Sequence, residues 1–248
     1  MTTFHLVHLY PTELGINGDR GNVIALWARL ASASHDVIVH DVGLGDTLPS
    51  DIDFVHVGSG PESSMPLVLD DARRHASRLR ELVEGGLPLL AVSAGWHLLG
   101  ETFADSGGDV YSGLGIFPSR AITTNQRWVS EVVIDVNGEL LTGFENHSGY
   151  VELADGHNPW ARVRAGFGNE GDLPATDRVE GVRHVNAIGT HLHGSLLPMN
   201  PHLADDFIQV MTTRRNASYT TAASMRQRDE FAAGSRAAIC TRMNVRTQ

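Results

Sequence analysis

The chain has 248 residues, of which 42% are hydrophobic and 19% are charged, and its formal net charge is -10. This composition predicts one ordinary globular domain over residues 1–248, long enough to bury a core without disulfides or metals. The acidity argues against nucleic acid or an anionic membrane surface as the main partner. The single cysteine, Cys240, excludes a disulfide framework and a cysteine-based zinc site. No signal-peptide pattern and no apolar run of membrane-spanning length is found, so the cytoplasm is the expected compartment.

Apolar runs alternate with helical patterns through the first hundred residues. Strands are expected at residues 4–9, 35–42, 53–57 and 88–92, and helices at residues 19–33 and 67–84. The first helix should bury a face that carries Val23, Leu26, Trp27 and Leu30. This order of strands and helices predicts an α/β fold, a three-layer αβα sandwich around a mostly parallel central sheet.

The second half of the chain is richer in strands. They are expected at residues 129–136, 140–144, 161–167 and 186–193. A helix is expected at residues 200–212, with Asn200 as a candidate cap and Pro201 at its first position. A last helix is expected at residues 222–240, and no repeat or linker divides the chain.

The segment from Pro88 to Gly100 has the form of a nucleophile elbow. An apolar strand runs into Ser93, the small residues Ala94 and Gly95 follow, and a helical pattern begins. Such a turn lifts the serine clear of the sheet and directs the Ala94 amide and the helix N-terminus at the same space, which favours a developing oxyanion. The competing interpretation is an ordinary βα turn with an unreactive serine.

A serine at an elbow needs a base, and two histidines near the end of a predicted strand are the candidates. His191 and His193 alternate along that strand, so we expect them to point the same way. His193 stands at the strand end, just before Gly194, and is the better base, with His191 as a neighbour in the cleft. The competing interpretation is that these histidines are ordinary packed side chains. A metal site is a weaker interpretation, because the spacing offers no third ligand.

Two further segments offer polar side chains. Asp19 lies in the loop after the first strand, where it is either a helix cap or a catalytic carboxylate at the carboxyl edge of the sheet. Glu145, Asn146 and His147 lie between glycines and form either a polar turn or part of a cleft.

Together these motifs resemble the glutamine amidotransferase subunits (GatD) of lipid II isoglutaminyl synthase, in the cobyric-acid-synthase-like branch of class I glutamine amidotransferases. The resemblance runs from about Leu9 to Ile208. It is carried by Tyr10-Pro11, Gly18 to Asn22, the elbow at Ser93, Gly143 to His147, Gly166 to Asn169, Glu180 to Arg183, Gly189 to Pro198, and Asn200-Pro201.

The resemblance implies a flavodoxin-like fold and a subunit that hydrolyses glutamine with a cysteine thiolate and a histidine. Ammonia would pass to a Mur-ligase-like (MurT-like) partner, which uses ATP and Mg to amidate D-glutamate of the lipid II stem peptide. By the same resemblance, Ser93 takes the place of the nucleophile, His193 that of the base, and Asp19 that of a third member. Residues implied to bind glutamine are Gly58, Gly60, Ala94, His97, Arg127 and Asn146. No cofactor or metal is expected on this chain, which has no P-loop pattern.

The sequence departs from the family pattern around the expected pocket. Ser93 replaces the cysteine, and Trp96 and His97 replace the usual Tyr-Gln. Because a hydroxyl is a far poorer nucleophile than a thiolate, we expect slow glutamine hydrolysis or none. Three interpretations stay open: an amidotransferase subunit, a catalytically silent subunit that only binds its ligase, and a serine hydrolase of the peptidase-E type.

Overall fold

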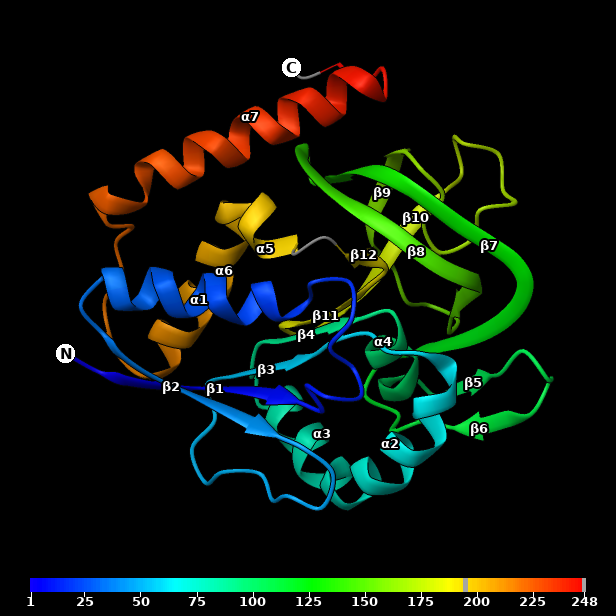
Figure 1. Ribbon diagram of the computed structural model, residues 1–248, viewed down its shortest axis with the longest axis horizontal. Helices are drawn as coiled ribbons and strands as arrows, with labels where there is room; N and C mark the ends of the chain where they lie inside the picture. Colours follow the sequence, from blue (N-terminus) through cyan, green and yellow to red (C-terminus); the bar gives the residue numbers. More distant parts are fainter. Residues whose placement is uncertain (194–195, 247–248) are drawn as a thin grey trace.

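The computed structural model describes residues 1–193 and 196–246, and its centre is a parallel sheet (Figure 1). The parallel strands lie in the order β2 (Asp36–Val42), β1 (Thr3–Leu9), β3 (Phe54–Val57), β4 (Leu89–Val92) and β11 (Ala187–Thr190). The strands β3, β4 and β11 are short and buried throughout, as expected of strands that are covered on both faces, whereas β2 is a partly exposed edge strand. The α/β fold with a mostly parallel central sheet is confirmed.

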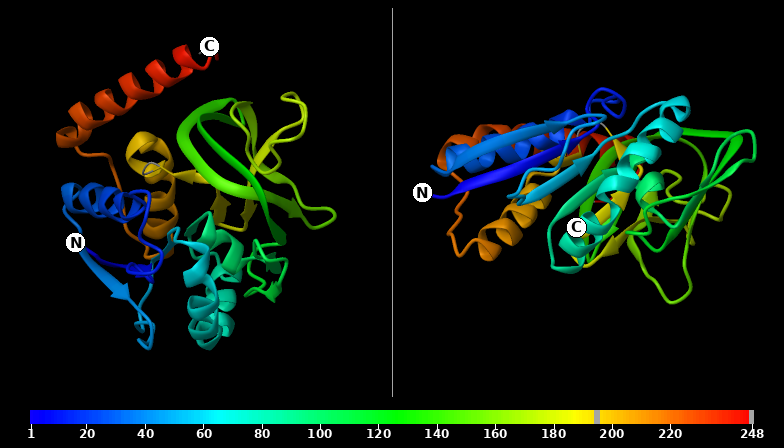
Figure 2. Two further views of the ribbon diagram at one scale, coloured as in Figure 1. Left: turned by 45° about the vertical axis from the view of Figure 1, so that its right-hand side comes forward. Right: turned by 90° about the horizontal axis from the view of Figure 1, so that it is seen from below.

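Helices cover both faces of these strands (Figures 1 and 2). One layer contains α1 (Arg20–Ser32), α5 (Leu196–Met199) and α6 (Pro201–Arg214), and the other contains α2 (Met65–Ala72), α3 (Ala76–Glu84) and α4 (Ala94–Leu99). Side chains of neighbouring residues in one strand point to opposite faces of the sheet and pack in different hydrophobic cores. Leu6 packs with the α1 and α6 side chains, whereas Val7 packs with those of α2 to α4. This alternation produces the three layers.

Beyond β11 the sheet continues in antiparallel strands. They are β10 (Val179–His184), β9 (Pro159–Ala165), β7 (Ser119–Val136), β8 (Glu139–Leu153) and β12 (Leu192–His193), with the small strands β5 (Thr102–Ala104) and β6 (Val110–Ser112) at the side. The hairpin of β7 and β8 is longer than the sequence predicted, and its pairing shifts between Ile122 and Arg127. The last long helix, α7 (Arg226–Arg242), lies outside α5 (Figure 1). None of the described helices is long and apolar enough to cross a membrane.

Three details differ from the predictions. The expected helix over residues 67–84 is divided by a 3-10 turn at Arg73–His75, which turns His75 into the interior. The expected strand over residues 186–193 is interrupted at His191, because β12 leaves β11 to pair with β8. Trp27 is 47% exposed, so the buried stripe of α1 is narrower than expected.

Asn200 stands at the predicted cap position of α6, but its side chain makes no capping hydrogen bond. It instead bonds the backbone of Thr142 in both directions, accepting from the N–H at 3.0 Å and donating to the carbonyl at 2.8 Å. Asn200 therefore ties the start of α6 to β8.

Candidate active site

Ser93 occupies the sharp turn between β4 and α4 that the sequence predicted. Its backbone angles, φ 47° and ψ -110°, lie in a region that non-glycine residues rarely adopt. The turn is held by the Ser93 N–H, which donates to the Thr190 carbonyl at 2.8 Å, and by the His97 N–H, which donates to the Ser93 carbonyl at 2.9 Å. A Cβ atom at Gly95 would lie 2.6 Å from the carbonyl oxygens of Val57 and Gly58. The elbow therefore requires a glycine at position 95.

Asp19 and His193 lie side by side in the interior. The Nδ1 atom of His193 is 3.3 Å from Oδ1 of Asp19, and both side chains are fully buried. The other oxygen of Asp19 accepts the N–H of Ser59 at 3.0 Å. Asp19 stands at the N-cap position of α1, as one interpretation expected, but its side chain makes no capping bond. Its carboxylate contacts the Ser59 N–H and the His193 imidazole instead.

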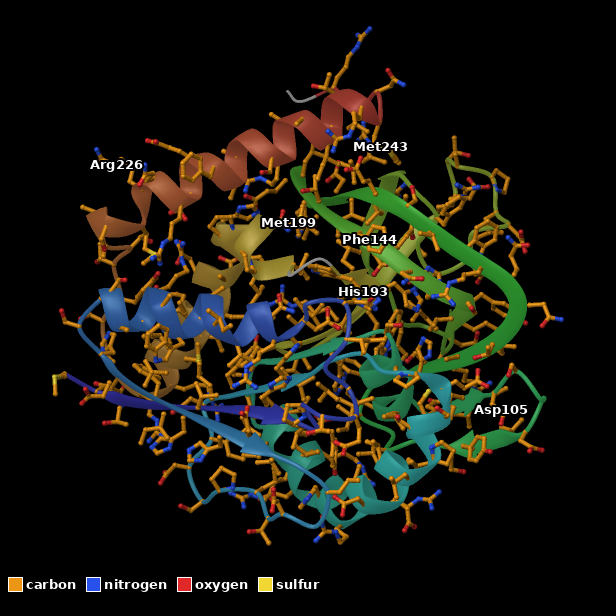
Figure 3. The ribbon with its side chains drawn as sticks, viewed as in Figure 1. Asp105, Phe144, His193, Met199, Arg226 and Met243 are labelled. Carbon is orange, nitrogen blue, oxygen red and sulfur yellow. The ribbon has the colours of Figure 1, made fainter. Side chains whose placement is uncertain are left out.

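The Nε2 atom of His193 faces away from Asp19, and it is buried without a hydrogen-bond partner among the described residues. In a nucleophile–histidine–carboxylate arrangement, this is the nitrogen that serves the nucleophile. No direct hydrogen bond joins it to Ser93 in the described part of the chain, so a link through one water stays a prediction. The Gly194 turn that was expected to follow His193 lies outside the described residues. Figure 3 shows His193 near the centre of the molecule, beside β8.

A pocket of about 390 Å³ opens above Ser93. Of the predicted site residues, it is lined by Gly60, Ser93, Ala94, His97, Arg127 and Asn146. Gly58 is not among the lining residues, because it packs beneath the elbow and its carbonyl accepts the Gly95 N–H at 3.1 Å. A side chain on Gly58 would meet the Leu14 carbonyl at 2.3 Å, so this glycine permits a close backbone approach.

Arg127 and Asn146 form one wall of the pocket, from opposite strands of the β7–β8 hairpin. Nε and Nη2 of Arg127 donate to Oδ1 of Asn146 at 3.0 and 2.6 Å. The irregular pairing before Arg127 re-aims this part of β7, as bulges do beside functional sites. The remaining guanidinium N–H groups can bind a carboxylate.

Three imidazoles meet at the base of the pocket. Nε2 of His97 lies 3.1 Å from Nε2 of His191, and the His191 ring stacks on His147 with centroids 3.8 Å apart. Burial, helped by the neighbouring His147 and His193, lowers the pKa of His97 to about 3. Burial also holds the pKa of His191 well below its ordinary value. His97 and His191 are therefore polar but uncharged at neutral pH.

The expectation that His191 and His193 point the same way is wrong. The break in the strand at His191 aims its ring at His97 and His147, whereas the His193 ring contacts Asp19. Glu145 also differs from its neighbours, because it points into the protein and accepts the N–H groups of Phe167 and Gly168 at 2.8 and 2.9 Å. Asn146 and His147 do line the pocket.

Sequence reasoning missed several lining residues. They are Ile16, Asn17, Ser59, Pro61, Glu62, Met65, Thr123 and Ser148. A signal was present at residues 123–126, where a polar Thr-Thr-Asn-Gln run interrupts the apolar pattern of β7. The other lining residues could not be predicted from sequence, because their place in the pocket depends on how the β7–β8 hairpin curves over the elbow.

The domain family described as "CobB/CobQ-like glutamine amidotransferase domain" matches residues 22–201, which is most of the chain. The chain belongs to this family.

Two curated relatives span nearly the whole chain. It is 28% identical over 220 residues to "Lipid II isoglutaminyl synthase (glutamine-hydrolyzing) subunit GatD" of Staphylococcus aureus, covering 86% of each chain. It is 27% identical over 219 residues to the subunit of the same name from Streptococcus pneumoniae, covering 87% of this chain and 82% of the relative. A solved structure titled "Structure of PurLQS from Thermotoga maritima" superposes with a TM-score of 0.52 at 19% identity, covering 86% of this chain and 99% of that one. This last likeness supports the fold alone.

Proposed function

We propose that this chain is the glutamine-binding subunit of a lipid II isoglutaminyl synthase. The observation that carries the proposal is the pocket lined by the elbow residue Ser93 and the guanidinium of Arg127. The buried pair of Asp19 and His193 adjoins this pocket, because Asp19 accepts the N–H of the lining residue Ser59. Arg127 would bind the α-carboxylate of glutamine, and Asn146 would hold that guanidinium in place. The side-chain amide would then reach Ser93, with the Ala94 N–H as oxyanion donor.

In this proposal, His193 takes the proton of the nucleophile and Asp19 stabilises the resulting imidazolium. The neutral His97 lines the amide end of the pocket. The ammonia released would pass to a Mur-ligase-like (MurT-like) subunit that carries ATP and Mg and amidates D-glutamate of the lipid II stem peptide. The names of the two curated relatives, each a subunit of such a synthase, support this partner. The reaction would take place in the cytoplasm.

Ser93 limits the activity of the chain as it stands. A cysteine at an elbow ionises readily, whereas a serine hydroxyl must lose its proton during the attack. Among the described residues, the buried Nε2 of His193 has no hydrogen-bond partner, so no bond to Ser93 prepares this transfer. This observation favours a second candidate function, in which the subunit keeps the fold and the docking surface but hydrolyses glutamine negligibly.

The test is glutamate release from glutamine by the purified chain with its Mur-ligase-like partner. We expect a rate near background for the unaltered protein and a rise of several orders of magnitude for Ser93→Cys. Ser50→Cys, which adds a thiol at an exposed position, is the control and should stay at background. A silent Ser93→Cys variant that still co-elutes with the ligase would favour the second candidate. Failure of both well-folded proteins to co-elute would contradict the proposed partner.

A further inference from the structure

A buried row of polar side chains lies behind His97 and has no part in the proposed reaction. Nε2 of His97 meets Nε2 of His191 at 3.1 Å, and Nδ1 of His191 faces Oε2 of Glu180 at 3.9 Å. His191 and Glu180 are almost completely buried, and these last two atoms have no hydrogen-bond partner among the described residues. The row therefore begins at the pocket and ends at a carboxyl group that solvent does not reach.

The surroundings of Glu180 fix the roles of its two oxygens. Oε1 accepts the Thr190 hydroxyl at 2.6 Å and the His191 N–H at 2.7 Å. Any proton on this carboxyl group therefore sits on Oε2, which faces His191. Burial, together with the negative charge of Glu145, raises the pKa of Glu180 to about 8, against the hydrogen bonds that lower it.

The geometry allows two arrangements of protons along the row. When Oε2 carries a proton, it faces the lone pair of His191 Nδ1 across 3.9 Å, which is longer than a formed hydrogen bond, and the His191 proton lies on Nε2. This Nε2–H donates to Nε2 of His97, which leaves His97 with an N–H at Nδ1. When Oε2 is ionised, Nδ1 of His191 carries the proton, Nε2 accepts from His97, and Nδ1 of His97 is a bare lone pair. Since Nε2 of His97 is engaged in the interior, Nδ1 is the nitrogen left to serve the pocket that this ring lines.

We propose that the proton of Glu180, relayed through His191, decides whether His97 presents a hydrogen-bond donor or an acceptor to a ligand beside Ser93. When Oε2 ionises, its proton passes to Nδ1 of His191, the proton on Nε2 of His191 passes to Nε2 of His97, and the proton on Nδ1 of His97 leaves to solvent in the pocket. Both imidazoles stay neutral. His191 is a positioning residue in this relay, and its ring is held in plane by stacking on His147.

Several other groups act on the relay. The ring of His191 is influenced by His97, His147 and His193, which disfavour its charged form, and by the backbone carbonyl of Gly168, which favours a proton on the ring. His97 is influenced by His147 and His193. All these imidazoles disfavour a second positive charge nearby, so the proton is passed along the row and does not accumulate on it.

The consequence concerns ligands that offer a carbonyl or carboxylate oxygen to His97. The donor state binds such an oxygen, whereas the acceptor state repels it. This consequence rests on the proposed function, because it takes L-glutamine and L-glutamate as ligands, but the relay itself does not.

Ring ¹⁵N NMR of the full chain tests the relay directly, with the His97 signals assigned from a His97→Gln variant. We expect His97 to carry its proton on Nδ1 at pH 6.5 and on Nε2 at pH 9.5. In Glu180→Gln the two donors at Oε1 hold the amide oxygen there, so the amide N–H₂ faces His191 and should keep the proton on Nδ1 at both pH values. His75→Phe, which removes a buried histidine outside the pocket, should behave like the unaltered chain. A His97 tautomer that does not change with pH, or that changes equally in Glu180→Gln, overturns the proposal.

Calorimetric titration with L-glutamate supplies a second measurement. At pH 7 the unaltered chain and Glu180→Gln should bind it equally. At pH 9 the unaltered chain should bind about fivefold more weakly than the variant, the effect of one lost hydrogen bond. The ligand titrates identically in both proteins, so their ratio isolates the relay. Equal affinities at pH 9 count against a role for His97 in selecting ligands. If neither glutamate nor glutamine binds, the proposed function fails, and the NMR result still decides the relay.

Discussion

Nδ1 of His193 lies 3.3 Å from the carboxylate of Asp19, and neither side chain is exposed to solvent. The two residues are far apart along the chain, Asp19 in the turn before α1 and His193 in β12. A buried carboxylate beside Nδ1 fixes the proton on that nitrogen and leaves Nε2 as the base.

Replacing Asp19 by Asn should therefore disable the histidine without removing it. In the Ser93→Cys background, we expect Asp19→Asn to lower the rate of glutamine hydrolysis by roughly 10²- to 10⁴-fold, because the amide favours the wrong tautomer of His193. Asp41→Asn, at an exposed position, is the control. The His193 tautomer, read by ¹⁵N NMR, should change in Asp19→Asn alone. An unchanged tautomer would show that Asp19 does not orient this ring.

Arg127 should determine affinity more than turnover. Truncation to Ala removes the guanidinium that faces the pocket, and we expect glutamine to bind roughly 10- to 100-fold more weakly, as for the loss of a charged hydrogen bond. Arg127→Lys should recover part of the loss, because it restores the charge without the planar geometry. Arg120→Ala, on the same strand but paired with Glu101 outside the pocket, should bind normally. Equal affinities of Arg127→Ala and Arg120→Ala in calorimetry would exclude this role.

Gly95 should be intolerant of the smallest side chain. A methyl group there would lie 2.6 Å from two carbonyl oxygens beneath the elbow, so Gly95→Ala should destabilise the protein by about 1–3 kcal/mol. Gly234 provides a matched control, because it lies within α7 and a methyl group would meet no atom within 4 Å. Gly234→Ala should stabilise the protein by about 0.5–1 kcal/mol. Urea unfolding measures both changes, and the same sign for both would contradict this account.

Glu180 should make stability depend on pH in an unusual direction. Its pKa is raised from 4.5 to about 8 by burial, so between these values the folded state holds a proton that the unfolded chain releases. The free energy of unfolding should therefore fall, through this group, as the pH rises from about 5 to 8. Glu180→Gln removes this dependence and should gain stability relative to the unaltered chain over that range. Glu230→Gln, on the exposed side of α7, should keep the original slope in urea titrations at each pH.

The local features of the site could be predicted from sequence. The apolar strand, Ser93, Ala94 and Gly95 specify the elbow, because a tight strand-to-helix turn needs small residues wherever it occurs. The alternation of strands and helices also predicted the parallel sheet, since it depends on the period of apolar residues along the chain. The long helix over residues 67–84 was expected to be continuous, and no local pattern indicated the 3-10 turn at its centre, where His75 is buried.

The sequence by itself therefore determined the α/β architecture, the elbow and the candidate nucleophile, because each depends on residues that are adjacent in the chain. Only the tertiary structure decided which side chains meet there. From sequence, Asp19 could equally be a helix cap or a catalytic carboxylate. Only the fold shows that it contacts His193, 174 residues away. From sequence, His191 was expected to point the same way as His193. In the structure, the end of β11 turns it toward His97 and Glu180. Contacts between residues so far apart in the chain depend on how buried surfaces pack in three dimensions, so local sequence patterns do not predict them.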